Sequence, residues 1–113
     1  MRILLDECLP KDLARELSGH TVKTVPQAGW AGISNGRLLR LIADSGKFDV
    51  FVTVDKHLPH QNKIKELPFA IVVLRAKSNR LIHVNPFALE ILRRLAGLQP
   101  GHVDVLSQSE EFP

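Results

Sequence analysis

Two stretches of this sequence run from apolar residues directly into carboxylates. Residues 2–5 (RILL) are followed by Asp6 and Glu7, and residues 50–54 (VFVTV) are followed by Asp55. If both stretches are parallel strands, their acids meet at the carboxyl edge of the sheet, where open α/β sheets bind ligands. Carboxylates held together repel each other, and a divalent cation relieves the repulsion. The pattern predicts a metal site at which Asp6 and Asp55 carry out catalysis on a phosphate ester.

Each of these acids also has a simpler interpretation when it is taken alone. Asp6 would cap a following helix by accepting backbone N–H bonds near Cys8, and Asp55 would do the same for the segment after it. Glu7 points away from Asp6 if the strand continues, which makes it a weaker candidate metal ligand. Thr53 either contacts substrate beside Asp55 or packs within the strand. The metal interpretation depends on the two aspartates lying at one edge of the sheet.

Basic residues follow two of the apolar stretches, at the edge of the sheet where the acids are predicted. Lys56 comes directly after the second acidic position, and Arg75, Lys77 and Arg80 follow another apolar stretch, residues 69–74. At the carboxyl edge these cations would bind the backbone of an RNA substrate while the acids bind a metal. Any one of them is also consistent with an ordinary solvent-exposed loop. The net charge of +3 and the pI of ≈ 9.4 permit an anionic partner without requiring one.

The apolar pattern indicates which strands position these groups. Three stretches, residues 2–5, 50–54 and 69–74, are apolar throughout, as central strands are. Residues 20–25 and 101–106 alternate between polar and apolar side chains, as edge strands do. The strand order 2-1-3-4-5 satisfies both conditions, and it brings the first and third strands together at the switch point. Asp6 is then expected beside Asp55.

Helix signals separate the strands. Proline at a first turn, cap residues and terminal glycines predict helices over about residues 10–18, from Ser34 or Asn35 to Gly46, within 55–66, and from Asn85-Pro86 to Gly97. Regular alternation of strands and helices predicts an α/β fold, a single three-layer α/β/α domain with a mainly parallel sheet. We expect this domain to span residues 1–106, with a flexible C-terminal tail over residues 107–113.

Composition narrows the class of protein. The 113 residues fit one domain, and the single cysteine, Cys8, excludes an internal disulfide and a zinc site built on several cysteines. No apolar run approaches the roughly 20 residues that span a bilayer. The N-terminal residues lead directly into a predicted strand and lack the layout of a signal peptide. We therefore expect a cytoplasmic protein with no membrane association.

Three motifs in this order resemble the PIN-like domains, in particular the compact group described as toxins of toxin–antitoxin systems. They are residues 4–10 (LLDECLP), 29–34 (GWAGIS) and 52–56 (VTVDK), and the resemblance extends over most of residues 1–106. It implies a ribonuclease that depends on Mg²⁺ or Mn²⁺, with Asp6 and Asp55 as metal ligands. A homodimer and a cognate antitoxin are implied in the same way.

The sequence departs from the PIN-like pattern at the start of the second helix. The family usually carries an acid at the position of Asn35, and another acid is common at the position of Arg37. Asn35 would either cap the helix or offer a neutral oxygen to a metal, which makes it a weak ligand candidate. Because neither residue supplies negative charge, an alternative function is a catalytically weakened module that binds nucleic acid or a partner protein.

A receiver-like phosphoacceptor domain is a third hypothesis. It shares the predicted strand order, and Asp6, Glu7 and Asp55 fit its acidic pattern. Such a domain needs a lysine at the end of its fifth strand, however, and this sequence has no lysine after Lys77.

Overall fold

The computed structural model describes residues 1–58 and 64–107, and within them the chain forms a five-stranded sheet whose paired strands are all parallel. The strand order β2-β1-β3-β4-β5 is the predicted one. The strands are β1 (Arg2–Leu5), β2 (Thr21–Thr24), β3 (Val50–Thr53), β4 (Ala70–Arg75) and β5 (Val103–Ser107). The prediction of a single α/β domain with this topology is confirmed.

Burial separates the central strands from the edge strands. Every residue of β3 is buried, as are all but one residue of β1 and of β4, whereas β2 and β5 each bury one residue. Strands covered on both faces need apolar side chains at successive positions, which is why the continuous apolar stretches occupy the centre. The register pairs Leu5 with Val52, so the next positions, Asp6 and Thr53, lie opposite each other where the two strands end.

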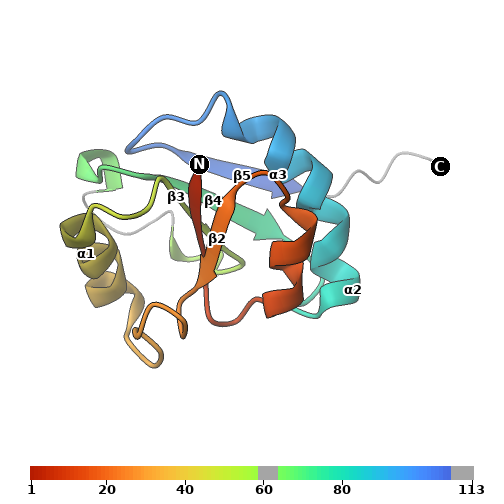
Figure 1. Ribbon diagram of the computed structural model, residues 1–113, viewed down its shortest axis with the longest axis horizontal. Coiled ribbons are helices and arrows are strands. Elements are labelled where there is room, and N and C mark those ends of the chain that lie inside the picture. Colours follow the sequence, from red (N-terminus) through yellow and green to blue (C-terminus); the bar gives the residue numbers. More distant parts are fainter. Residues whose placement is uncertain (59–63, 108–113) are drawn as a thin grey trace.

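Helical segments cover both faces of the sheet (Figure 1). One face packs against the 3₁₀ helix η1 (Lys11–Glu16) and the run α2 (Leu81–Val84), η4 (Asn85–Phe87) and α3 (Ala88–Leu95). The opposite face packs against α1 (Asn35–Ser45), with Leu38 and Ile42 in the same core as Leu4 and Phe51 of the strands. Because successive side chains of a strand point to opposite faces, each central strand contributes to both cores. The molecule therefore has the predicted three layers.

Two of the predicted helices differ from those observed. The first, expected over residues 10–18, is the 3₁₀ helix η1. Short connectors often take the tighter 3₁₀ form, although η1, with six residues, is longer than most such helices. The last helical run begins at Leu81 rather than at Asn85, because Asn85 has a helical backbone (φ −57, ψ −37) and continues the chain from α2 into η4.

The remaining differences concern the ends of segments. Ser107, which was predicted to begin the tail, is the last residue of β5, and the rest of the tail lies outside the described residues. The short helix predicted within residues 55–66 is represented by η3 (Ile64–Glu66), and residues 59–63 lie outside the described part of the chain. α1 agrees with its prediction, since Ser34 is its N-cap residue and Gly46 ends it with a left-handed backbone (φ 64).

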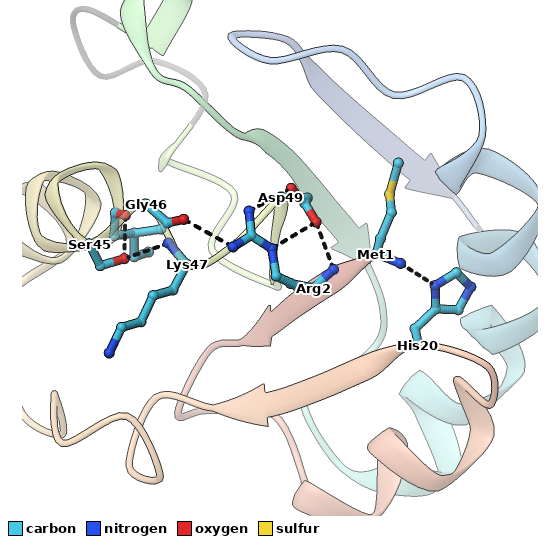
Figure 2. Close-up of polar contacts among 8 residues, drawn as sticks. Met1, Arg2, His20, Ser45, Gly46, Lys47 and Asp49 are labelled. Carbon is cyan, nitrogen blue, oxygen red and sulfur yellow. Dashed lines mark hydrogen bonds and ion pairs between the residues drawn. The ribbon is translucent and has the colours of Figure 1, made fainter.

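The amino end of the sheet is fastened by one arginine (Figure 2). The Arg2 guanidinium donates to both carboxylate oxygens of Asp49, at 3.3 and 3.1 Å, and to the carbonyl of Gly46 at 3.0 Å. These bonds join the start of β1 to the start of β3 and to the end of α1. The Arg2 side chain and its backbone N–H hold the pKa of Asp49 below its ordinary value.

No helix in the described part of the chain is long and apolar enough to cross a membrane.

Candidate functional site

Asp6 lies where β1 ends, with its side chain turned toward β3. Its backbone N–H donates to the Val52 carbonyl at 2.9 Å, which extends the strand pairing by one residue. Its Oδ2 accepts the Thr53 hydroxyl at 2.6 Å, and its Oδ1 accepts the Glu7 backbone N–H at 2.8 Å. The residue is only 7% exposed. Both carboxylate oxygens are therefore oriented by neutral donors.

Burial makes the charged form of Asp6 unfavourable. Removal from water raises the pKa of Asp6, and the hydrogen bonds from Thr53, the Glu7 backbone and Cys8 only partly oppose this. The Cys8 thiol is half-buried, and burial, with a smaller contribution from the Asp6 charge, raises its pKa to about 11. It stays protonated at neutral pH. Cys8 is a neighbour of the site that the sequence pattern did not single out, although it stands two residues after Asp6.

Thr53 connects the two aspartates. Its hydroxyl donates to Asp6 and accepts the backbone N–H of Asp55 at 3.0 Å. The side chain is completely buried. Because one hydroxyl spans both strand ends, Asp6 and Asp55 are placed together at the carboxyl edge, as the strand order predicts. The sequence predicted that Thr53 either contacts substrate or packs within the strand. Its buried side chain lies between the two acids, and a contact with substrate stays a prediction.

Asp55 is held from two sides. Its Oδ1 accepts the His57 backbone N–H at 2.9 Å, and its Oδ2 accepts the side-chain amide Nδ2 of Asn35. A carboxylate offers only acceptors, so the nitrogen of the Asn35 amide, and not its oxygen, faces Asp55. Asn35 is the first residue of α1, and the cap position itself belongs to Ser34. Asn35 therefore acts as a donor to the second aspartate, a role that neither sequence interpretation described.

Glu7 joins the end of β1 to the loop before α1. Its Oε1 accepts the backbone N–H of Gly32 at 2.8 Å, across 25 positions of sequence. Gly32 has a left-handed backbone (φ 79), and Trp30 of the same loop packs edge-on against Phe48 with ring centroids 6.1 Å apart. Glu7, the loop and Asn35 thus form a second connection between the two strand ends, in addition to the one through Thr53.

The residues present can be tested against the metal that the PIN-like resemblance implies. No group of three or more His, Cys, Asp or Glu side chains within residues 1–58 and 64–107 is placed to hold a metal ion. Asp55 accepts one hydrogen bond on each carboxylate oxygen, and Asp6 accepts one on each oxygen together with a weaker one from the Cys8 thiol. Both carboxylates therefore retain lone pairs for a cation. Mg²⁺ is often bound by one or two carboxylates with water and substrate phosphates. The pair fits such an ion, although the Asn35 amide competes for Asp55.

The predicted basic residues lie around this edge. Lys56, Arg75, Lys77 and Arg80 are all exposed, and none takes part in the ion pairs found among the described residues. Arg37 is exposed on α1. These positions are compatible with the predicted substrate rim, because each cation is accessible and has no carboxylate partner in the described part of the chain.

Comparisons with protein-family models, with curated proteins and with solved structures find no match, and the resemblance to PIN-like domains therefore stays a prediction.

Proposed function

We propose that this protein is a metal-dependent ribonuclease of the PIN-like type. The observation that carries the proposal is the pairing of Asp6 and Asp55 at the carboxyl edge of the sheet through the hydroxyl of Thr53. Asp6 is buried with a raised pKa and receives hydrogen bonds only from neutral groups. A site that collects negative charge without a cationic side chain is suited to a bound cation.

The residues have distinct roles in this proposal. Asp6 and Asp55 hold Mg²⁺ or Mn²⁺, and the Thr53 hydroxyl orients the Asp6 carboxylate and fixes the backbone at Asp55. When bound, the ion supplies a polarised water and stabilises charge on the phosphoryl group. The exposed cations of the rim bind the RNA backbone on either side of the acids. Glu7, which accepts the Gly32 N–H, orients the loop before α1 rather than serving as a principal metal ligand.

Cleavage assays with matched variants test the proposal. The purified chain should cleave RNA in Mn²⁺ or Mg²⁺ and stop in excess EDTA. Asp6→Asn and Asp55→Asn should each abolish cleavage, whereas Asp44→Asn, which changes an exposed acid of α1 outside the site, should cleave like the wild type. If diverse RNAs survive prolonged incubation with Mn²⁺, or if the two site variants cleave normally, the ribonuclease proposal is wrong.

The bond from Asn35 to Asp55 favours a second candidate function, a module that binds RNA or a partner protein without cleaving it. Because the Asn35 amide donates to Asp55, the negative charge of that carboxylate is partly stabilised without a metal. This candidate predicts RNA binding that persists in EDTA and in Asp6→Asn and Asp55→Asn. Its expected signature is binding without any cleavage under all metal conditions.

The PIN-like resemblance extends the proposal to a homodimer, to a cognate antitoxin and to a cytoplasmic location. Light scattering on the purified chain measures the first, and co-purification with a neighbouring encoded protein tests the second. The receiver-like hypothesis is less well supported, because β5 (Val103–Ser107) contains no lysine to contact a phosphoryl group. A phosphoryl adduct formed from a small phosphodonor and lost in Asp55→Asn would revive it.

A further inference from the structure

The segment that joins β4 to α2 displays three cations within six residues, Arg75, Lys77 and Arg80. All three are exposed, and none joins an ion pair among the described residues. The sequence contains no acidic residue between Glu66 and Glu90. No carboxylate nearby along the chain therefore offsets the positive charge of this segment, residues 75–80.

Ser78 orders the part of this segment that leads into α2. Its Oγ accepts the backbone N–H of Arg80 at 3.1 Å and lies 2.6 Å from Nδ1 of His83. The Arg80 carbonyl in turn accepts the backbone N–H groups of His83 and Val84, at 2.9 and 3.0 Å. This part of the segment is thus tied to the first turn of α2 through both side-chain and backbone bonds. A segment fixed in this way loses little conformational entropy when it binds a ligand.

The segment leaves the sheet at the same edge as the two aspartates. β3 and β4 are paired with Thr53 opposite Val73. β4 continues to Arg75, whereas Asp55 follows the last residue of β3 by two positions. Both residues therefore lie at the carboxyl ends of neighbouring parallel strands.

We propose that residues 75–80 form a preorganised binding site for consecutive phosphate groups of a polynucleotide backbone, and that Ser78 and His83 position it. Arginine is suited to phosphate because its planar guanidinium donates two parallel hydrogen bonds, and lysine adds a point charge. Contacts to phosphate position a strand without reading its bases. The site therefore accepts the backbone whatever the sequence. This inference deepens the proposed function by stating where the substrate backbone lies, and it is testable without cleavage.

Binding titrations in EDTA separate the site from general electrostatic attraction. The probes are fluorescein-labelled single-stranded oligouridylate and oligothymidylate, measured by anisotropy over a range of salt concentrations. Replacing Arg75, Lys77 and Arg80 by glutamine should weaken binding of both probes by more than about tenfold and reduce the salt slope by about 2, since each lost single-strand phosphate contact removes about 0.7. The control triple variant changes Lys23, Arg40 and Lys47, exposed cations elsewhere, to glutamine. It carries the same net charge and should keep most of the affinity and the slope.

Ser78 variants test the positioning role without altering charge. Ser78→Ala should weaken binding by about fivefold through lost preorganisation, whereas Ser78→Thr, which keeps the hydroxyl, should bind like the wild type. Circular dichroism confirms that each variant is folded. Equal affinities of the two triple variants would overturn the site, and wild-type affinity in Ser78→Ala would overturn the role of Ser78. These titrations contain no metal and therefore do not depend on cleavage. If the wild type binds both probes in EDTA but leaves RNA intact in a separate incubation with Mn²⁺, the ribonuclease proposal is wrong and this site stands.

Discussion

Asn35→Asp is the substitution that most directly probes how the carboxylate edge is held together. In the wild type the Asn35 amide donates to Asp55. Aspartate at this position has no donor when charged, so the variant loses a hydrogen bond to a charged group, worth about 1.5–3 kcal/mol. It also places two like charges near each other, which costs about 4 kcal/mol at about 4 Å and an effective dielectric constant of about 20. Both side chains are partly exposed, so water reduces this repulsion, and we expect a total loss of about 2–4 kcal/mol.

Urea unfolding at neutral pH in EDTA measures this loss. Asn35→Ala is the matched control, because it removes the donor without adding a charge. The free energy of unfolding should decrease from the wild type to Asn35→Ala and again to Asn35→Asp. If Asn35→Asp is as stable as the wild type in EDTA, the hydrogen bond between Asn35 and Asp55 does not stabilise the fold, and the reasoning is wrong.

Divalent metal should reverse the loss in the same variant. A ligand present at about 100 times its dissociation constant stabilises the folded state by about 2.7 kcal/mol. With a third carboxylate available, Mn²⁺ should raise the free energy of unfolding of Asn35→Asp more than that of the wild type. Cleavage activity should rise with it if the scaffold is that of a nuclease. If Mn²⁺ stabilises both proteins equally, a third acid at this position does not complete a metal site.

Three further predictions concern the fold and the loop before α1. Gly101→Ala should lower the free energy of unfolding, measured in urea, by at least about 2 kcal/mol. The glycine has φ +81, and a Cβ there would lie 2.5 Å from the backbone oxygen of Lys65. Gly19→Ala is the control and should cost less, because Gly19 has a similar φ (+87) but open space around it. The lowered pKa of Asp49 means that its pairing with arginine stabilises the fold above the unfolded-state pKa. The stability difference between wild type and Asp49→Asn should therefore shrink as pH falls below 3.8 through the folded-state pKa, and a difference independent of pH would contradict the pairing. Glu7→Ala should free the loop before α1 and shift the fluorescence of the single tryptophan, whereas Glu7→Gln, which still offers an oxygen to Gly32, should not.

Most of the fold could be predicted from apolar patterning because patterning reports burial. Strands covered on both faces need continuous apolar residues, and strands at the edge tolerate alternation, so the order of the sheet followed from the contrast between Val50–Thr53 and Thr21–Thr24. Asp6 and Asp55 follow two of the central strands, so the strand order alone was enough to predict that they lie at one edge of the sheet. Local start and stop signals were less reliable. The Asn85-Pro86 pair resembles a helix start, but the chain is already helical from Leu81.

The contacts within the site could not be predicted, because a periodic pattern shows which face a side chain occupies but not which neighbour it meets. The hydroxyl of Thr53 between the two aspartates depends on the register of β1 with β3 and on one rotamer. The bond from Glu7 to Gly32 spans a loop whose path depends on left-handed glycines. The sequence was consistent with Asn35 as a helix cap or as a metal ligand. Its hydrogen bond to Asp55 depends on how α1 packs near the end of β3, which no local pattern indicates.

Asn35 changes the charge and the hydrogen bonding of the carboxylate edge when no ligand is bound. A third carboxylate here would add a charge that a cation would have to neutralise. The Asn35 amide instead donates to Asp55, and Asp6 stays a buried acid whose pKa is raised by desolvation. Within the proposed function, metal affinity is then low in the free protein, because the ion must displace the amide from Asp55. Substrate phosphates are themselves ligands for Mg²⁺. A polynucleotide held on residues 75–80 would bring these oxygens to the acids and supply the charge that Asn35 does not. Metal and RNA would then bind cooperatively, each raising the affinity for the other by the same factor. Because Asn35 stands where the PIN-like pattern has an acid, tight metal binding would require bound RNA.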